Sequence, residues 1–163
     1  MRSNQIERKY KMKNNKYRNW LITSLLIIAI AGIFSVSHAA DAKDDVVIIV
    51  NKNVADKSIS KKDLKDIFLN KKSKWSNGKK VIPVTLKSGD IHKSFLKNYV
   101  SKTASQFSKY WKKLVFTGKA KAPKTFKNEK EMLAYVAKTP GAIGYVSSKT
   151  AKDSKVVNTI AVK

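Results

Sequence analysis

The chain contains no cysteine, so it has neither a disulfide nor a thiolate metal site. Acidic residues are also scarce, because 11 aspartates and glutamates stand against 35 lysines and arginines, for a formal net charge of +24. A charge of this size attracts polyanions such as nucleic acid, anionic lipid or an acidic polymer. The hydrophobic content of 42% is too high for a disordered basic tail, so we expect a folded domain.

Arginine is confined to the start of the chain, at Arg2, Arg8 and Arg18. Residues 40–163 carry 28 lysines and 10 acidic residues, a net charge of +18. The planar guanidinium fork that grips an oxyanion with two parallel hydrogen bonds is therefore absent from this part. An anion bound there must be held by lysine, hydroxyl and backbone groups.

The residues that catalysis needs are few and scattered. His92 is the only histidine after residue 39, and one histidine with dispersed carboxylates does not make a metal site. The nucleophile elbow G-x-S-x-G and the glycine-rich nucleotide loops are absent. Asp63 and Asp66 are spaced three apart on a predicted helix, where we expect solvated charges rather than an acid–base pair. We therefore expect a protein that is not an enzyme and needs no cofactor.

The first 39 residues have the order of a secretory signal: basic residues, an apolar run and a small-residue cleavage site. Lys13, Lys16 and Arg18 precede the apolar run 20–34, and Ala39 ends the small-residue stretch. We expect cleavage after Ala39 and a periplasmic or secreted protein, with Met12 as the expected true start. The alternative is an uncleaved membrane anchor, although the run falls short of the roughly 20 residues of a spanning helix.

Residues 40–163 have the length of one ordinary domain, and their pattern alternates strands with helices. Ser60, Thr103 and Asn128 have the positions of helix N-caps, and Thr103 with Gln106 has the form of a capping box. The sequence therefore predicts an α/β fold. The expected strands are 46–50, 81–86, 142–146 and 156–162, and the expected helices are 60–68, 91–99, 103–115 and 129–138.

The stretch 81–100 contains a strand, a polar turn and the start of a helix. Ser88 and Gly89 lie in the turn, with Lys87 before it and Lys93 after it. Backbone N–H groups at the start of a helix lack partners and attract anions, so the turn is a candidate oxyanion site. The alternative is that Gly89 only turns the chain and that Ser88 or Asp90 caps the helix.

Aromatic residues interleave with lysines in the second half of the domain, a combination that suits single-stranded nucleic acid. Phe107, Tyr110, Trp111 and Leu114 recur at helical spacing, however, which favours a role in the core. The export signal also places the protein away from nucleic acid. We therefore expect no nucleic-acid partner, and contact with a membrane only through the N-terminal segment if it is uncleaved.

Four segments, in this order, carry a resemblance to a known family: 47–51, 64–68 followed by Trp75, 84–95, and Pro-Gly-Ala-Ile-Gly-Tyr-Val at 140–146. Together they resemble the periplasmic phosphate-binding proteins of ABC transporters, and most closely their short single-domain relatives. The resemblance covers roughly residues 46–146. It implies one small lobe of the periplasmic-binding-protein type, with a few-stranded sheet flanked by about four helices.

The resemblance also implies a site at the turn. Ser88 and Gly89 match the Ser-Gly step of the family's anion loop, and Asp90 stands where threonine is usual. The family's arginine has no counterpart, so Lys87 or His92 is the nearest cation. The implied anion-binding residues are Lys87, Ser88, Gly89, Asp90, His92 and Lys93.

Length separates the chain from the two-lobed members of the family. Residues 40–163 correspond to their second lobe, and a single lobe cannot close over its ligand. We therefore expect weak binding of phosphate or a related oxyanion, with an inner-membrane transporter as the partner. The alternative is an envelope interaction protein that kept the fold, lost the ligand and binds a polyanion or partner through its basic surface.

Overall fold

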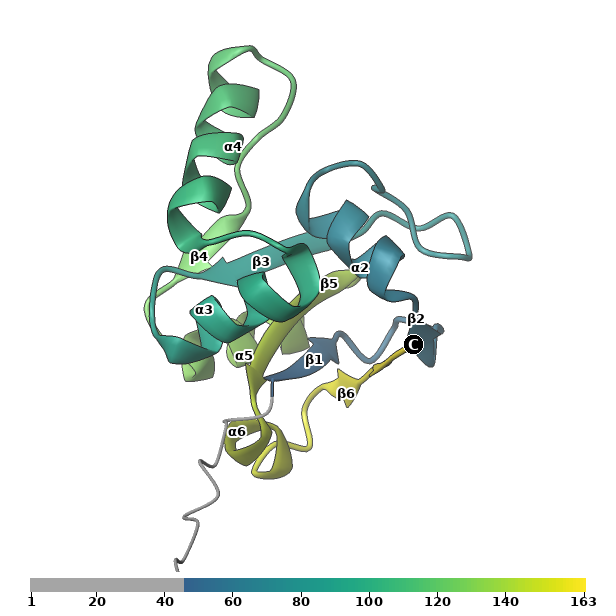
Figure 1. The fold of residues 1–163 in the computed structure, drawn as a ribbon. Helices are drawn as coiled ribbons and strands as arrows, with labels where there is room; N and C mark the ends of the chain where they lie inside the picture. The colour runs from purple at the N-terminus through teal and green to yellow at the C-terminus, as the bar shows by residue number, and fades with distance from the viewer. Residues whose placement is uncertain (1–45) are drawn as a thin grey trace, which may run out of the picture. The chain divides into compact units, whose positions relative to one another are not determined.

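A mixed five-stranded sheet forms the centre of the domain in this computed structural model, which describes residues 46–163 (Figure 1). The strand order is β4-β3-β5-β1-β6. β3 pairs in parallel with β4 and β5, whereas β1 pairs antiparallel with β5 and β6. The bounds are β1 Val46–Val50, β3 Ile82–Leu86, β4 Lys124–Phe126, β5 Ala142–Ser147 and β6 Asn158–Thr159.

Helices cover both faces of this sheet, as Figure 1 shows. Tyr145 of β5 packs against Phe68 and Phe95 on one face, with ring centroids 6.0 and 3.8 Å away. The neighbouring Gly144 packs against Met132 on the other face, because successive strand residues point to opposite sides. The helices are α2 Lys61–Phe68, α3 Asp90–Phe95 with its π-helical continuation η1 Leu96–Val100, α4 Ala104–Phe116, α5 Glu129–Lys138 and α6 Ser148–Lys152.

The three predicted helix starts are confirmed. Ser60 accepts a hydrogen bond from the Asp63 N–H at 2.9 Å, and Asn128 accepts one from the Glu131 N–H at 2.9 Å. Thr103 and Gln106 form the complete capping box. These caps depend on residues three apart in the chain, so local sequence is sufficient to predict them.

The α/β class is confirmed, but several short elements differ from the prediction. The segment 117–127 lies outside all the expected strands and helices, yet it contains the edge strand β4, in which only Phe126 is buried. The expected strand 156–162 is two short strands, β6 and β7 (Ala161–Val162). The chain changes sheets at Ile160: Ile160 bonds to β1, and β7 pairs in parallel with β2 (Ser58–Ile59). No local pattern marks such short strands, because their partners come from distant segments.

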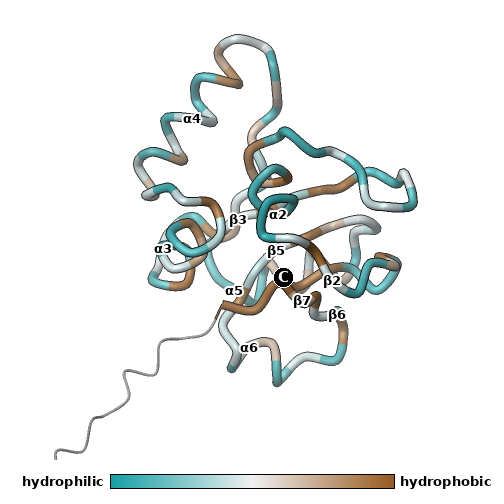
Figure 2. Tube along the Cα trace, turned by 45° about the vertical axis from the view of Figure 1, so that its right-hand side comes forward, coloured by the Kyte–Doolittle hydropathy of each residue, from teal (hydrophilic) through white to brown (hydrophobic). Residues whose placement is uncertain are grey.

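Helix α4 extends away from the sheet, and the following loop returns beside it to β4 (Figure 1). Its middle is fixed to the end of α2, since Tyr110 Oη donates to the Leu69 carbonyl at 2.7 Å and Trp111 Nε1 donates to the Phe68 carbonyl at 3.2 Å. Figure 2 shows apolar and polar segments alternating along α4. Its last residue, Phe116, is 93% exposed.

The predicted signal segment 1–39, its cleavage site and the expected start at Met12 lie outside the described residues. Within residues 46–163, no helix has the length and apolar character needed to cross a bilayer.

Candidate functional site

The predicted sequence of strand, turn and helix is present at the candidate anion loop, residues 87–90. β3 ends at Leu86, and the Lys87 N–H is bound to the Phe126 carbonyl of β4 at 2.8 Å. Gly89 has φ +105° and ψ 168°, a conformation that is essentially restricted to glycine. α3 begins directly after it, so a glycine is required for β3 to lead into this helix.

The loop leaves its backbone donors free. The N–H groups of Ser88, Gly89 and Asp90 have no hydrogen-bond acceptor within residues 46–163, and all three residues are exposed. Neither Ser88 nor Asp90 caps α3, because Gly89 occupies the N-cap position and no side chain within residues 46–163 accepts a hydrogen bond from a backbone N–H of the first turn. The alternative in which Ser88 or Asp90 caps the helix is therefore wrong, and the donors stay available to an anion.

The charged side chains of the loop are arranged unequally. Asp90 forms an ion pair with Lys93 at 2.9 Å, with both side chains largely exposed. Lys93 is thereby engaged by a carboxylate, whereas Lys87 forms no ion pair with any residue in 46–163. Of the cations in the loop, Lys87 is therefore the one with no ion-pair partner in the described part of the chain.

His92 lies in the core rather than in the exposed loop. It is 5% exposed, and its Nδ1 lies 2.5 Å from the Tyr145 hydroxyl oxygen. Burial lowers the pKa of His92 and raises the pKa of Tyr145. His92 is thus a neutral imidazole and not the cation that the resemblance implied. Its burial has a sequence signal, because His92 lies three and four residues before Phe95 and Leu96 on the apolar face of the helix.

The hydrogen bonds around Tyr145 fix the tautomer of His92. The Tyr145 oxygen accepts the Leu86 N–H at 3.1 Å, and Nδ1 of His92 is the one acceptor that the hydroxyl proton has within residues 46–163. The imidazole proton therefore resides on Nε2. In the sequence, Tyr145 is marked only as part of the motif 140–146. A tyrosine inside an apolar strand was the one sequence signal of its role.

The motif 140–146 owes its two glycines to close packing. A Cβ on Gly141, whose φ is +79°, would lie 2.3 Å from the Lys80 carbonyl oxygen. A Cβ on Gly144 would lie 2.8 Å from Met132 Sδ. Trp75 Nε1 donates to the Gly141 carbonyl at 3.1 Å. Trp75 and the motif, two of the segments that carried the resemblance, therefore meet in one packing arrangement.

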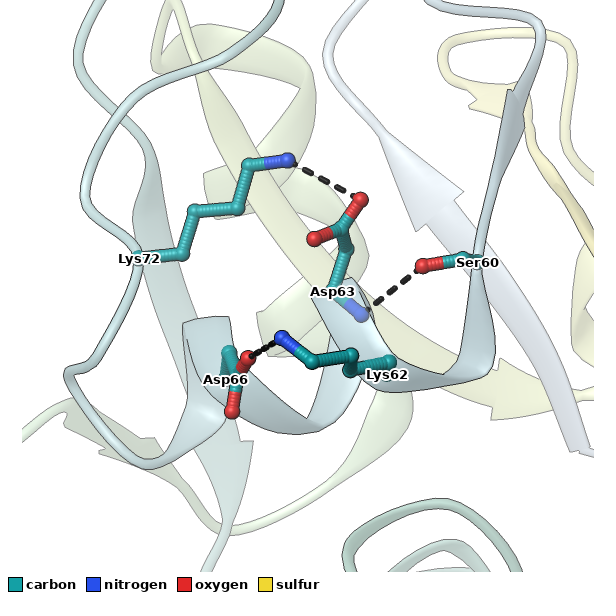
Figure 3. Close-up of polar contacts among 5 residues, drawn as sticks. All are labelled: Ser60, Lys62, Asp63, Asp66 and Lys72. Carbon is teal, nitrogen blue, oxygen red and sulfur yellow. Dashed lines mark hydrogen bonds and ion pairs between the residues drawn. The ribbon is translucent and has the colours of Figure 1, made fainter.

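The carboxylates of α2 are paired with lysines and not with each other (Figure 3). Lys62 Nζ lies 2.9 Å from Asp66, and Lys72 Nζ lies 3.0 Å from Asp63. The hydrogen bond from Lys72 lowers the pKa of Asp63. The two carboxylates are thus partly buried and ion-paired, rather than freely solvated as expected. Within residues 46–163, no three histidine or acidic side chains are grouped as a metal site.

Solved structures with the same fold include several phosphate-transport proteins. One is a phosphate ABC transporter substrate-binding protein with bound phosphate from Clostridium perfringens, with 18% identity and a TM-score of 0.59 over 73% of this chain and 45% of that one. Another is PstS from Borrelia burgdorferi, with 20% identity and a TM-score of 0.57 over 74% and 47%. A possible phosphate-binding protein from Planctomyces limnophilus has 13% identity and a TM-score of 0.53 over 74% and 42%.

The chain thus spans less than half the length of these proteins. A comparison with curated proteins gives no match. The PBP superfamily domain matches residues 34–162, which is most of the chain. The predicted phosphate-binding-protein-like fold is confirmed, and the chain belongs to the PBP superfamily domain family.

Proposed function

We propose that this domain is an oxyanion-binding lobe that holds phosphate or a related anion at residues 87–93. The observation that carries the proposal is the turn at Gly89. This turn presents the N–H groups of Ser88, Gly89 and Asp90 beside Lys87, and none of these groups has a partner among residues 46–163. The bound phosphate of the Clostridium perfringens protein, which shares the fold, supports the choice of anion. The role is binding rather than catalysis.

Each residue of the loop has a distinct part in this proposal. Ser88 donates its hydroxyl, and Gly89 lets the backbone approach the anion because it has no Cβ. Lys87 supplies the positive charge. Asp90 would repel a dianion, so it either remains paired with Lys93 or accepts the proton of monohydrogen phosphate. His92 stabilises the loop through its hydrogen bond with Tyr145 and carries no charge.

The affinity should be low, because the loop is exposed and the anion stays partly hydrated. Residues 46–163 contain no arginine, so the bidentate grip of a guanidinium group is missing. We expect a dissociation constant of about 0.1–1 mM, which is roughly 4–5.5 kcal/mol of binding free energy.

Isothermal titration calorimetry with phosphate, at low and at physiological salt, tests this function. A specific site gives saturable one-to-one heat that survives salt, whereas diffuse surface charge gives heat that disappears with salt. Loss of all heat at physiological salt would contradict the proposal. A sub-micromolar constant would contradict the weak binding expected of an open loop.

A basic interaction surface is the second candidate function. Residues 91–128 contain ten lysines and no acidic residue, and they include the extended helix α4. In this alternative the domain keeps the fold without the ligand and binds an acidic polymer or an envelope partner. Salt-sensitive binding to a polyanion, together with no phosphate heat, would favour it.

Export completes the proposal, with the domain delivering its oxyanion to a transporter in the membrane. The basic, apolar and small-residue order of residues 1–39 supports it. Mass spectrometry of the protein from a producing cell should find a chain that begins at Ala40. An intact apolar run 20–34 would instead show a protein anchored in the membrane.

A further inference from the structure

A cavity of about 560 Å³ adjoins the anion loop, between the ends of β3 and β4 and the extended helix α4. Its walls are mainly apolar and include Phe107 and Trp111 of α4 and Pro123 of the returning loop. This volume is in the range of sites that hold small organic molecules. Lys87 lines the cavity and also belongs to the anion loop, so the cavity begins beside the loop.

His92 supplies a buried polar group to this cavity. The residue is 5% exposed and lines the cavity, and its Nδ1 is occupied by Tyr145. Its other nitrogen, Nε2, carries the proton and has no acceptor within residues 46–163. Because His92 lies at the wall of this open cavity, its Nε2–H can donate to an oxygen of water or of a ligand there.

The charge of the cavity has one sign. Lys87 and Lys112 line it, and no acidic side chain does. The two ammonium groups and the N–H of His92 are hydrogen-bond donors. The other polar side chains that line the cavity are hydroxyls, which can donate or accept. The complementary ligand therefore combines acceptor oxygens and negative charge with an apolar body.

We infer that the ligand of this lobe is an organic phosphate monoester, whose apolar substituent occupies the cavity while its phosphate lies at residues 87–90. The inference rests on the proposed oxyanion function and names its substrate class. An oxygen of the ester accepts the Nε2–H of His92, and the substituent packs against Phe107 and Trp111. Inorganic phosphate fills only the loop and leaves the apolar walls in contact with water.

Calorimetric titration of the full chain with phenyl phosphate and with inorganic phosphate tests this inference. Phenyl phosphate should bind at least about tenfold more tightly than inorganic phosphate, because its ring buries apolar surface in the cavity. Equal affinity for the two would overturn the inference and leave the oxyanion function intact. If neither ligand gives heat, both the inference and the proposed oxyanion function are wrong.

Two serines of α4 provide a matched pair of variants. Ser108 is exposed and lines the cavity, whereas Ser105 is exposed on the same helix and does not line it. Ser108→Trp should fill the cavity and abolish the advantage of phenyl phosphate, with binding of inorganic phosphate unchanged. Ser105→Trp should keep that advantage. If Ser108→Trp binds phenyl phosphate as tightly as the parent, the substituent lies elsewhere and the inference is wrong.

Discussion

The Tyr145 hydroxyl oxygen lies 2.5 Å from Nδ1 of His92, 53 residues earlier in the chain. The same oxygen accepts the Leu86 N–H, and the Tyr145 ring is stacked on Phe95 at 3.8 Å. One side chain of the central strand β5 thus joins the end of β3 to the helix α3. The anion loop lies between these two elements, so its shape depends on Tyr145.

Tyr145→Phe removes only the hydroxyl and keeps the ring. The Leu86 N–H and His92 Nδ1 would then be buried without a partner, so we expect the free energy of unfolding to fall by about 1–3 kcal/mol. Urea denaturation measures this change. Tyr99→Phe is the control, because no hydrogen bond of the Tyr99 hydroxyl is found within residues 46–163. Equal loss in both variants would contradict the role given to Tyr145.

Burial of His92 makes stability depend on pH. Its pKa is lowered in the folded state, so the unfolded chain binds the proton first as pH falls. The neutral His92 contributes its full stabilisation above the pKa of the unfolded chain, about 6.5. This stabilisation is lost as the pH falls from that value to the lower pKa of the folded state. Within this window the free energy of unfolding should fall by up to ~1.4 kcal/mol per pH unit.

Urea denaturation from pH 7 to pH 5 checks this expectation, with His92→Phe as the control. The variant should be less stable at pH 7, but its free energy of unfolding should depend much less on pH. Asp63 contributes little in this range, because its pKa is lowered below the usual value and it titrates in more acid solution. A slope that is unchanged in His92→Phe would show that another group causes it.

The sequence predicts this fold well wherever the signal is local. Caps such as Ser60 and Asn128, and the glycine turn before α3, follow from residues within a few positions of one another. β4 was missed because its only buried residue, Phe126, gives no alternating pattern. The anion loop was predicted from its pattern of strand, turn and helix start and again through the resemblance, but the support by Tyr145 was not, since it depends on three segments that meet only in the folded chain.

Alanine variants of Gly141 and Gly118 distinguish the effect of close packing from the effect of backbone strain. Both have positive φ, +79° and +68°, but only Gly141 has a backbone oxygen where a Cβ would lie. We expect Gly141→Ala to destabilise the domain by about 2–4 kcal/mol and Gly118→Ala by about 1 kcal/mol. Thermal and urea unfolding measure both. Equal effects would contradict the close approach of Lys80 and Gly141.

Variants of the loop test the proposed roles by calorimetry with phosphate. Ser88→Ala should weaken binding through loss of the hydroxyl, and Gly89→Val should weaken it more, because its Cβ blocks the anion and φ +105° is strained for valine. Valine is strained at φ +105° even though open space surrounds the position of its Cβ, so Gly89→Val also changes the loop backbone, and circular dichroism must show that the rest of the domain stays folded. If both variants bind like the parent, the site lies elsewhere.

Asp90→Asn distinguishes the two roles left open for this carboxylate. If Asp90 only pairs with Lys93, removal of its charge should leave phosphate binding unchanged or tighter. If Asp90 accepts the proton of monohydrogen phosphate, the variant should lose phosphate affinity relative to sulfate, which has no proton to donate at neutral pH. The ratio of the two dissociation constants, measured in parent and variant, decides between them.

The central claim is that the free N–H groups of Ser88, Gly89 and Asp90 bind the oxyanion. The most direct measurement is a ¹H–¹⁵N correlation spectrum of the chain during a phosphate titration at physiological salt. We predict saturable shifts of these three amide signals, with a midpoint of about 0.1–1 mM phosphate. Shifts distributed over the lysine-rich segment 91–128, with the three amides unmoved, would contradict it.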